Sequence, residues 1–194
     1  MRRTPLATLA PCAALALCAA LALGGCGGGD PKPKFTDSPD PSPSASSSAA
    51  TEPQPPEMPD AAKRHTVAGA KAFNEYFWQV ATYASESLDT ALFSSLMSDE
   101  CAGCRGALNG IRKLRKQKAE VSGGANSTEN VKVVRLKSGS AYPMEVTSDV
   151  HSTKQVITVP SGHKDIYYPS TSRVRLILNP VSGGWSVGYW EVMS

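Results

Sequence analysis

The spacing of apolar residues changes once along the chain, near Val131, and this change limits the fold more than any other feature. Before it, apolar side chains recur at helical spacing, which predicts helices over about residues 65–85, 89–97 and 101–116. After it, they alternate with a period of two. The alternation predicts strands at 131–136, 142–151 and 154–159, and a hairpin of 173–178 with 185–190. Helices followed by strands predict an α+β domain in which an antiparallel sheet packs on the helices.

Two polar segments between these elements are expected to be loops. Gly123 and Gly124 precede the polar run 126–130, and prolines bound the segment 160–169, which contains His163. In the first helix, Trp78 lies beside the apolar stripe rather than on it. Two interpretations of Trp78 stay open, a packing residue at the edge of the core or a stacking platform for a ligand.

The N-terminal 25 residues have the pattern of an export signal. Arg2 and Arg3 precede an apolar stretch over residues 6–23, which leads into Leu23-Gly24-Gly25-Cys26. A leucine three positions before a cysteine, followed by small residues, resembles the lipobox of bacterial lipoproteins. The resemblance implies that residues 1–25 are removed and that Cys26 is lipidated. An uncleaved signal anchor and a plain secreted protein remain the alternatives.

Residues 26–60 are predicted to be a disordered tether rich in glycine, proline and serine. Of the 15 prolines, 9 fall between Pro31 and Pro59, and residues 27–60 carry a net charge of −4. The predicted extracytoplasmic domain, residues 61–194, carries 16 basic and 11 acidic residues. From Cys26 onward the chain has 18 basic and 17 acidic residues, so a dedicated nucleic-acid-binding protein is excluded.

Cys101 and Cys104 are the only thiols left if Cys26 is lipidated. An exported protein meets an oxidising environment, which favours a structural disulfide between them. A redox pair at a helix N-terminus is the second interpretation, although Asp99 and Glu100 disfavour a thiolate there. A metal site is the third, but the sequence has no second pair of ligands at suitable spacing. We therefore expect no bound metal.

Asp149 and His151 share one face of a predicted strand with Glu145 and Thr147. If that face lined a pocket, the acid and the imidazole would be suited to general-base chemistry. If it faced solvent, the alternation would be ordinary strand patterning.

Five basic residues cluster near the end of the third predicted helix: Arg112, Lys113, Arg115, Lys116 and Lys118. They complement the helix dipole, which is one explanation for them. Contact of the outward-facing Arg112, Lys113 and Lys116 with anionic headgroups is the other.

Several short motifs follow one another in a fixed order. They are Gly69-Ala70-Lys71-Ala72-Phe73, Cys101-Ala102-Gly103-Cys104, the Gly-Gly stretch, and Gly183-Gly184-Trp185-Ser186-Val187. With the lipobox and tether, this order resembles a family of uncharacterised lipoproteins from high-GC Gram-positive bacteria, whose domain has no assigned function. The layout is also similar to the cone-shaped α+β fold of nuclear transport factor two and the polyketide-cyclase-like proteins. That resemblance implies a sheet curved around a pocket that helices close, but no activity.

These features together predict a lipid-anchored protein on the extracytoplasmic face of the cell membrane, whose domain is a binding or interaction module. The expected partners are the membrane, through the anchor, and an envelope protein or a small-molecule ligand. A small-molecule enzyme that uses a pocket of the same fold is the main alternative, and a structural envelope component is the third. The sequence has no phosphate-binding glycine loop or nucleotide fingerprint, so no cofactor is expected.

Overall fold

The first predicted helix forms as α1, Val67–Ser87, in the computed structural model of the chain, which describes residues 53–137 and 142–194. Thr66 caps its start, because the side-chain oxygen accepts a hydrogen bond from the backbone N–H of Gly69 at 3.0 Å. Leu88, with φ 58°, ends it in the left-handed region. The predicted apolar stripe is buried throughout: Ala70, Phe73, Tyr76, Phe77, Val80 and Ala84. This helix is confirmed, two residues further along than expected.

Three shorter helical elements accompany α1 in the described part of the chain. The 3-10 turn η1, Asp60–Lys63, precedes α1, and α2, Ala91–Ser95, and α3, Ala102–Lys116, follow it. Lys118, with φ 51°, lies beyond the end of α3, as predicted. Met58 is half-buried against the core, so the chain joins the domain slightly before the expected boundary at residue 61. Within residues 53–137 and 142–194, no helix is long and apolar enough to cross a membrane.

The strands form two antiparallel sheets. The body sheet has the order β2-β3-β6-β7, with β2 at Asn126–Arg135, β3 at Met144–Ser152, β6 at Ser170–Val181 and β7 at Gly184–Met193. The arm has the order β1-β4-β5, with β1 at Glu120–Gly123, β4 at Gln155–Thr158 and β5 at Lys164–Tyr167. The predicted α+β class, helices followed by an antiparallel sheet, is therefore confirmed.

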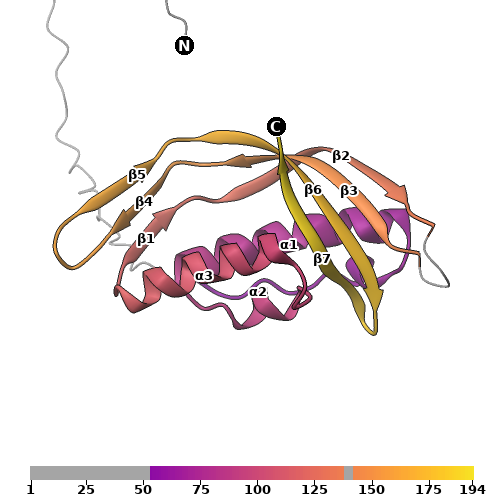
Figure 1. Cartoon of the computed structure of the whole chain (residues 1–194), viewed down its shortest axis with the longest axis horizontal. Helices are drawn as coiled ribbons and strands as arrows, with labels where there is room; N and C mark the ends of the chain where they lie inside the picture. Colours follow the sequence, from indigo (N-terminus) through magenta and orange to yellow (C-terminus); the bar gives the residue numbers. More distant parts are fainter. Residues whose placement is uncertain (1–52, 138–141) are drawn as a thin grey trace, which may run out of the picture. The chain divides into compact units, whose positions relative to one another are not determined.

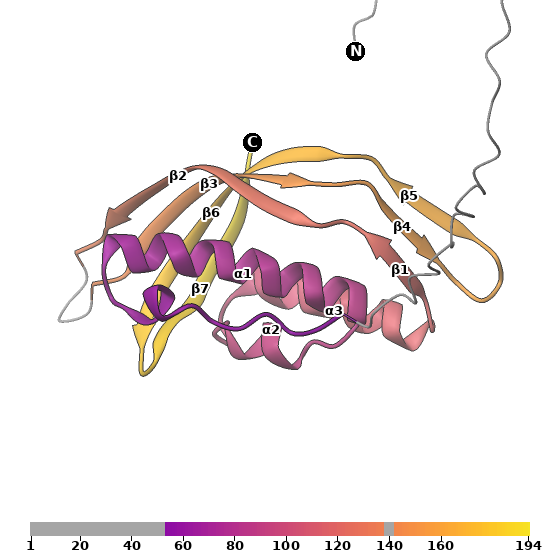
Figure 2. The same ribbon diagram turned by 180° about the vertical axis from the view of Figure 1, so that it is seen from behind.

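The arm continues three strands of the body sheet beyond a short interruption in each. β1 runs on into β2, β3 into β4 and β5 into β6 (Figures 1 and 2). The interruptions lie at the same level, at residues 124–125, 153–154 and 168–169. Two backbone hydrogen bonds bridge the first pair there, from Gly124 N–H to Lys154 O at 3.0 Å and from Thr153 N–H to Ala125 O at 2.9 Å. The break is thus a local change in pairing within long, continuous strands.

Two segments expected to be loops are strands instead. Residues 126–130 belong to β2 and pair with β3 up to a bulge after Glu129, and Lys164 and Asp165 belong to β5. Thr82 of α1 explains part of the first error, because its hydroxyl oxygen accepts hydrogen bonds from the backbone N–H and the side-chain amide of Asn126. The polar start of β2 is therefore held by the helix rather than by apolar burial.

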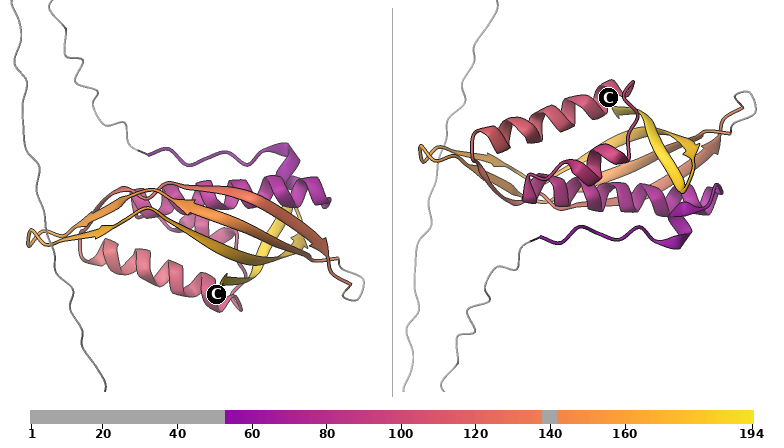
Figure 3. Two further views of the ribbon diagram at one scale, coloured as in Figure 1. Left: turned by 90° about the horizontal axis from the view of Figure 1, so that it is seen from above. Right: turned by 90° about the horizontal axis from the view of Figure 1, so that it is seen from below.

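The helices cover one face of the body sheet (Figure 3). Buried aromatic side chains pack between the helices and the sheet. Phe77 is at the centre of this aromatic cluster, with ring centroids 5.4 Å from Phe93, 5.5 Å from Trp78, 5.9 Å from Trp190 and 6.5 Å from Phe73. The sheet contributes Met144, Val146, Val150, Val174, Leu176 and Leu178, all buried. The side on which the resemblance implied a pocket is occupied by packed side chains.

Trp78 is 6% exposed and belongs to this aromatic cluster, where its ring meets Trp190 edge to face at 5.4 Å. Of the two interpretations of Trp78, the structure favours the packing residue, although the side chain lies deeper than an edge position.

Gly103, between the two cysteines, lets α3 approach β7 closely. A Cβ atom at this position would lie 2.4 Å from the backbone oxygen of Trp190. We expect Gly103→Ala to lower the free energy of unfolding by about 1–3 kcal/mol, because either the helix or the strand must move. Urea unfolding of the domain measures this change.

The same helix provides a matched control. A Cβ atom at Gly110 would meet nothing within 4 Å. Gly110→Ala should therefore raise the free energy of unfolding, by about 0.5–1 kcal/mol, since alanine is the better helix former. Effects of the same sign and size at both positions would contradict the close approach at Gly103.

Candidate functional site

Asp149 and His151 lie on the face of the body sheet that the helices leave uncovered. Along β3, Met144, Val146, Ser148 and Val150 are buried under the helices, and the alternate residues Glu145, Thr147, Asp149 and His151 point the other way. The prediction that these four side chains share a face agrees with this alternation. The expectation that Asp149 and His151 line a pocket is corrected by the structure, because they do not border the space between the sheet and the helices. Strand patterning on an outer face describes them better.

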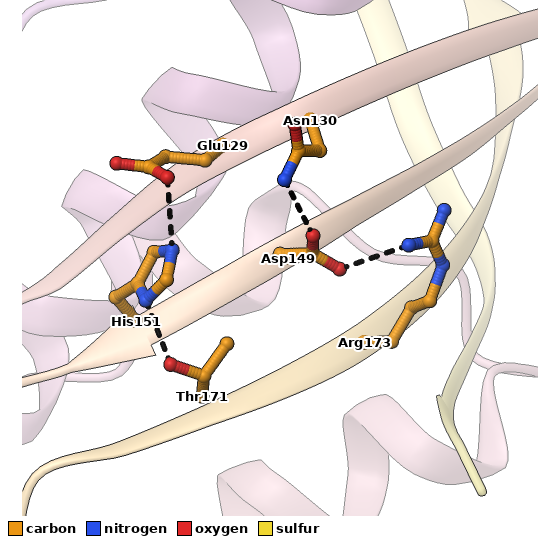
Figure 4. A network of polar contacts seen from close by, with 6 residues as sticks. All are labelled: Glu129, Asn130, Asp149, His151, Thr171 and Arg173. Carbon is orange, nitrogen blue, oxygen red and sulfur yellow. Dashed lines mark hydrogen bonds and ion pairs between the residues drawn. The ribbon is translucent and has the colours of Figure 1, made fainter.

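Each member of the pair has partners of its own on the neighbouring strands (Figure 4). Asp149 accepts a hydrogen bond from the Asn130 side-chain amide at 2.8 Å and pairs with Arg173 at 3.2 Å. His151 Nδ1 lies 2.7 Å from Thr171 Oγ1, and its Nε2 lies 3.4 Å from a carboxylate oxygen of Glu129. These contacts form two rows of side chains, Asn130–Asp149–Arg173 and Glu129–His151–Thr171. The two rows run side by side across β2, β3 and β6.

The row Thr171–His151–Glu129 places a hydroxyl, an imidazole and a carboxylate in the order of a nucleophile, a base and an orienting acid. The contact between His151 and Glu129 is an ion-pair distance without hydrogen-bond geometry. Glu129 and Thr171 are exposed to solvent. A base that works in water on an open sheet gains little from its neighbours, so the row fits a surface network better than a catalytic group.

A third polar group lies on the same face, and its residues were not singled out in the sequence. Arg175 donates to a carboxylate oxygen of Glu191 at 2.5 Å and lies over the ring of Tyr189, 5.4 Å from its centroid. Contacts with Tyr189, and then with Glu191, raise the pKa of the Arg175 guanidinium. The outer face of the body sheet therefore carries charges that are largely paired with one another.

Cys101 and Cys104 form a disulfide, as predicted. Both are buried, and Cys101 is the N-cap of α3, its sulfur accepting from the backbone N–H of Cys104 at 3.3 Å. The bond joins the turn before α3 to its first helical turn, which contacts β7 at Gly103. A buried position against packed side chains favours the structural interpretation over an exposed, reactive pair.

The five basic residues at the end of α3 are all exposed: Arg112, Lys113, Arg115, Lys116 and Lys118. We call them the basic end of α3. Leu108 is buried and Ile111 and Leu114 are half-buried on the opposite side of the helix. The predicted division of α3 between an apolar and a basic face is thus present. Cys26, the predicted lipidation site, lies outside the described residues.

A hollow of about 280 Å³ lies at the strand interruptions, between the end of α1 and the base of the arm. Its lining includes Ser85, Asn126, Gln155, Tyr167 and Tyr168. We call it the tyrosine hollow. None of these five residues was selected from the sequence, because they are scattered over four segments. The sequence feature that could have indicated the hollow is the Gly123-Gly124 pair together with Pro169, because these residues lie where the strands are interrupted.

Comparisons with known proteins supply a family and distant structural similarities. A family model described as "Family of unknown function (DUF6318)" matches residues 41–194. The chain is similar to the intermembrane space region of chloroplast protein ARC6, with a TM-score of 0.48, 11% identity, and coverage of 68% of this chain and 98% of that one. None of the curated proteins compared with the chain matches it.

Two further solved structures resemble the chain at lower scores. Aln2 from a Streptomyces species gives a TM-score of 0.38 at 15% identity, covering 63% of this chain and 89% of that one. An NTF2-like protein with a cystatin-like fold from Novosphingobium aromaticivorans gives 0.35 at 14% identity, covering 66% and 89%. Similarities this distant carry no information about a ligand or an activity.

Proposed function

We propose that this chain, which belongs to the DUF6318 family of unknown function, is a lipid-anchored, extracytoplasmic protein whose domain is a binding module. The observation that supports binding at the surface, and not in an enclosed pocket, is the aromatic cluster around Phe77, which fills the space between the body sheet and the helices. A ligand or partner therefore meets the surface of the domain, at its polar sheet face, its helices or its hollows.

The anchor is inferred from the sequence before Cys26, which resembles the lipobox of bacterial lipoproteins, including those of high-GC Gram-positive bacteria. The Cys101–Cys104 disulfide supports export, because such bonds persist in oxidising surroundings and are rare in the cytosol. The segment between Cys26 and Met58, where the chain joins the domain, would then be a tether that holds the domain near the outer surface of the cell membrane.

The basic end of α3 supports contact between the domain and that membrane. Residues 61–194 carry a net charge of +5, from 16 basic and 11 acidic residues, whereas residues 27–60 carry −4. The domain is thus the part attracted to anionic headgroups, and each basic residue near them adds about 1 kcal/mol. The exposure of all five side chains leaves them free to approach a surface.

We expect a fragment of residues 53–194 to bind vesicles that contain anionic lipid and to release them as salt rises. Replacing Arg112, Lys113 and Lys116 by glutamine should weaken this binding at least about tenfold at low salt. Vesicle co-sedimentation at several salt concentrations measures both effects.

The matched control replaces Lys132, Lys154 and Lys164, three exposed lysines on the strands and their turns, by glutamine. It removes the same charge from another surface and should weaken binding much less. Equal losses in the two triple variants, or equal binding to neutral and anionic vesicles, would contradict a membrane contact through α3.

A small-molecule enzyme remains the second proposal, and the row Thr171–His151–Glu129 is the observation in its favour. It is the weaker proposal, because the imidazole and the carboxylate are not hydrogen-bonded and the row lies on an open face.

A further inference from the structure

The tyrosine hollow exists because three strands are interrupted at one level. At residues 124–125, 153–154 and 168–169 the arm separates from the body sheet, and α1 ends close by at Ser87 (Figures 1 and 2). Residues at these interruptions and at the end of α1 border a space of about 280 Å³. This size lies just below the range of about 300–1,000 Å³ for drug-sized ligands, so it suits a small molecule.

Every residue that lines the tyrosine hollow is electrically neutral. The lining consists of serine and threonine hydroxyls, the amides of Asn126 and Gln155, the two tyrosines, and Gly124. The surfaces nearby differ, since the outer face of the body sheet and the basic end of α3 are rich in charge. A neutral lining gives an anion or a cation no counter-charge, so a neutral, polar ligand fits it best.

The two amides are held in place by neighbouring side chains. The Gln155 side chain donates to Ser85 Oγ at 3.0 Å, and it crosses Gly124 so closely that a Cβ atom there would lie 2.3 Å from its Nε2. Asn126 donates to Thr82 Oγ1 at 3.2 Å and accepts from Ser152 Oγ at 2.7 Å. Each amide has two N–H donors and an oxygen with two lone pairs, so part of its hydrogen-bonding capacity is left for a ligand.

Tyr167 and Tyr168 add aromatic surface to this polar lining. These residues are 56% and 75% exposed, although large aromatic residues are usually placed for packing. Both tyrosines border the hollow rather than the core, at the end of β5. An aromatic ring beside fixed amides presents an apolar face and polar groups to the same ligand.

We propose that the tyrosine hollow binds a neutral saccharide. Sugar hydroxyls both donate and accept hydrogen bonds, which matches amides and hydroxyls that do the same. The C–H face of a sugar ring packs on a tyrosine ring, and one or two rings suit the size of the hollow. The inference rests on the proposed binding function and names its ligand class.

The test is saturation-transfer NMR on the full chain in detergent, with maltose, cellobiose and N,N′-diacetylchitobiose as probes. Glucose 6-phosphate and the peptide Gly-Ser-Gly are the comparison ligands. At least one neutral disaccharide should bind, and better than either comparison ligand. Tyr168→Ala should weaken its binding about threefold to tenfold, the factor for losing one aromatic contact. Gln155→Ala should weaken it as well.

Tyr142→Ala is the matched control, because Tyr142 is 53% exposed and belongs to neither the hollow nor the arm. It should leave saccharide binding unchanged. The proposal is overturned if none of the three disaccharides binds at millimolar concentration, if the peptide or the phosphate binds instead, or if Tyr168→Ala and Tyr142→Ala have equal effects. The saccharide measurement depends neither on vesicles nor on lipidation of Cys26, so its failure would leave the anchor and the membrane contact to be judged by their own tests.

Discussion

Replacing Phe77 by alanine is expected to lower the free energy of unfolding by about 3–5 kcal/mol, the usual cost of removing a fully buried phenylalanine. Phe77 has no exposed surface and lies within 6.5 Å, ring centroid to centroid, of four other aromatic side chains. These come from two helices and from β7, so the cavity would lie where helices and sheet meet. Chemical denaturation followed by tryptophan fluorescence measures the change.

Tyr168→Ala is the control for Phe77→Ala, since it also truncates an aromatic side chain but at an exposed site. Its free energy of unfolding should stay within about 0.5 kcal/mol of the original value. A cost below about 1 kcal/mol for Phe77→Ala would mean that the space between sheet and helices is loosely packed. That space could then hold a buried ligand, contrary to the surface binding proposed for this domain.

Replacing Cys26 by alanine is expected to move most of the protein out of its mature membrane-bound form. The thiol of Cys26 is the acceptor of the proposed lipid, and it follows Leu23, Gly24 and Gly25. Without the thiol no acyl group can be attached, so metabolic labelling with palmitate should be lost. The variant should then accumulate as an unprocessed precursor or be released from the membrane fraction.

Cys12→Ala and Cys18→Ala are the controls for the anchor. Pro11 and Leu17 precede these cysteines where a lipobox has a small residue, so both variants should be labelled and processed normally. Normal labelling of Cys26→Ala, or loss of labelling in either control, would show that Cys26 is not the lipidated residue.

The parts of the fold that follow from local periodicity could be predicted from the sequence. The stripe along α1 and the β6–β7 hairpin have strong periods, and both form close to the expected positions. β5 and the start of β2 could not be found in this way, because their residues are polar or exposed and their pairing depends on neighbouring strands. An edge strand with little burial has no apolar alternation to reveal it.

The candidate sites likewise differ in how much of each could be predicted from the sequence. The alternation along β3 puts Asp149 and His151 on one face, but which face the helices cover depends on the packing of α1. The disulfide joins cysteines three residues apart, so the pair could be predicted without knowing the fold. The tyrosine hollow joins Ser85 to Tyr168, and only the tertiary structure brings such distant residues together.

Because the three strand interruptions are aligned, the arm and the body of the domain also differ in the free energy needed to open them. The arm is tied to the body through continuous backbone and a few contacts with α1, whereas the aromatic cluster lies entirely beneath the body sheet. Opening the arm would expose little of the apolar surface that stabilises the fold, so its local free energy of opening is smaller than that of global unfolding. The end of the domain with the tyrosine hollow can therefore open on its own, while the helices and the disulfide keep the body folded.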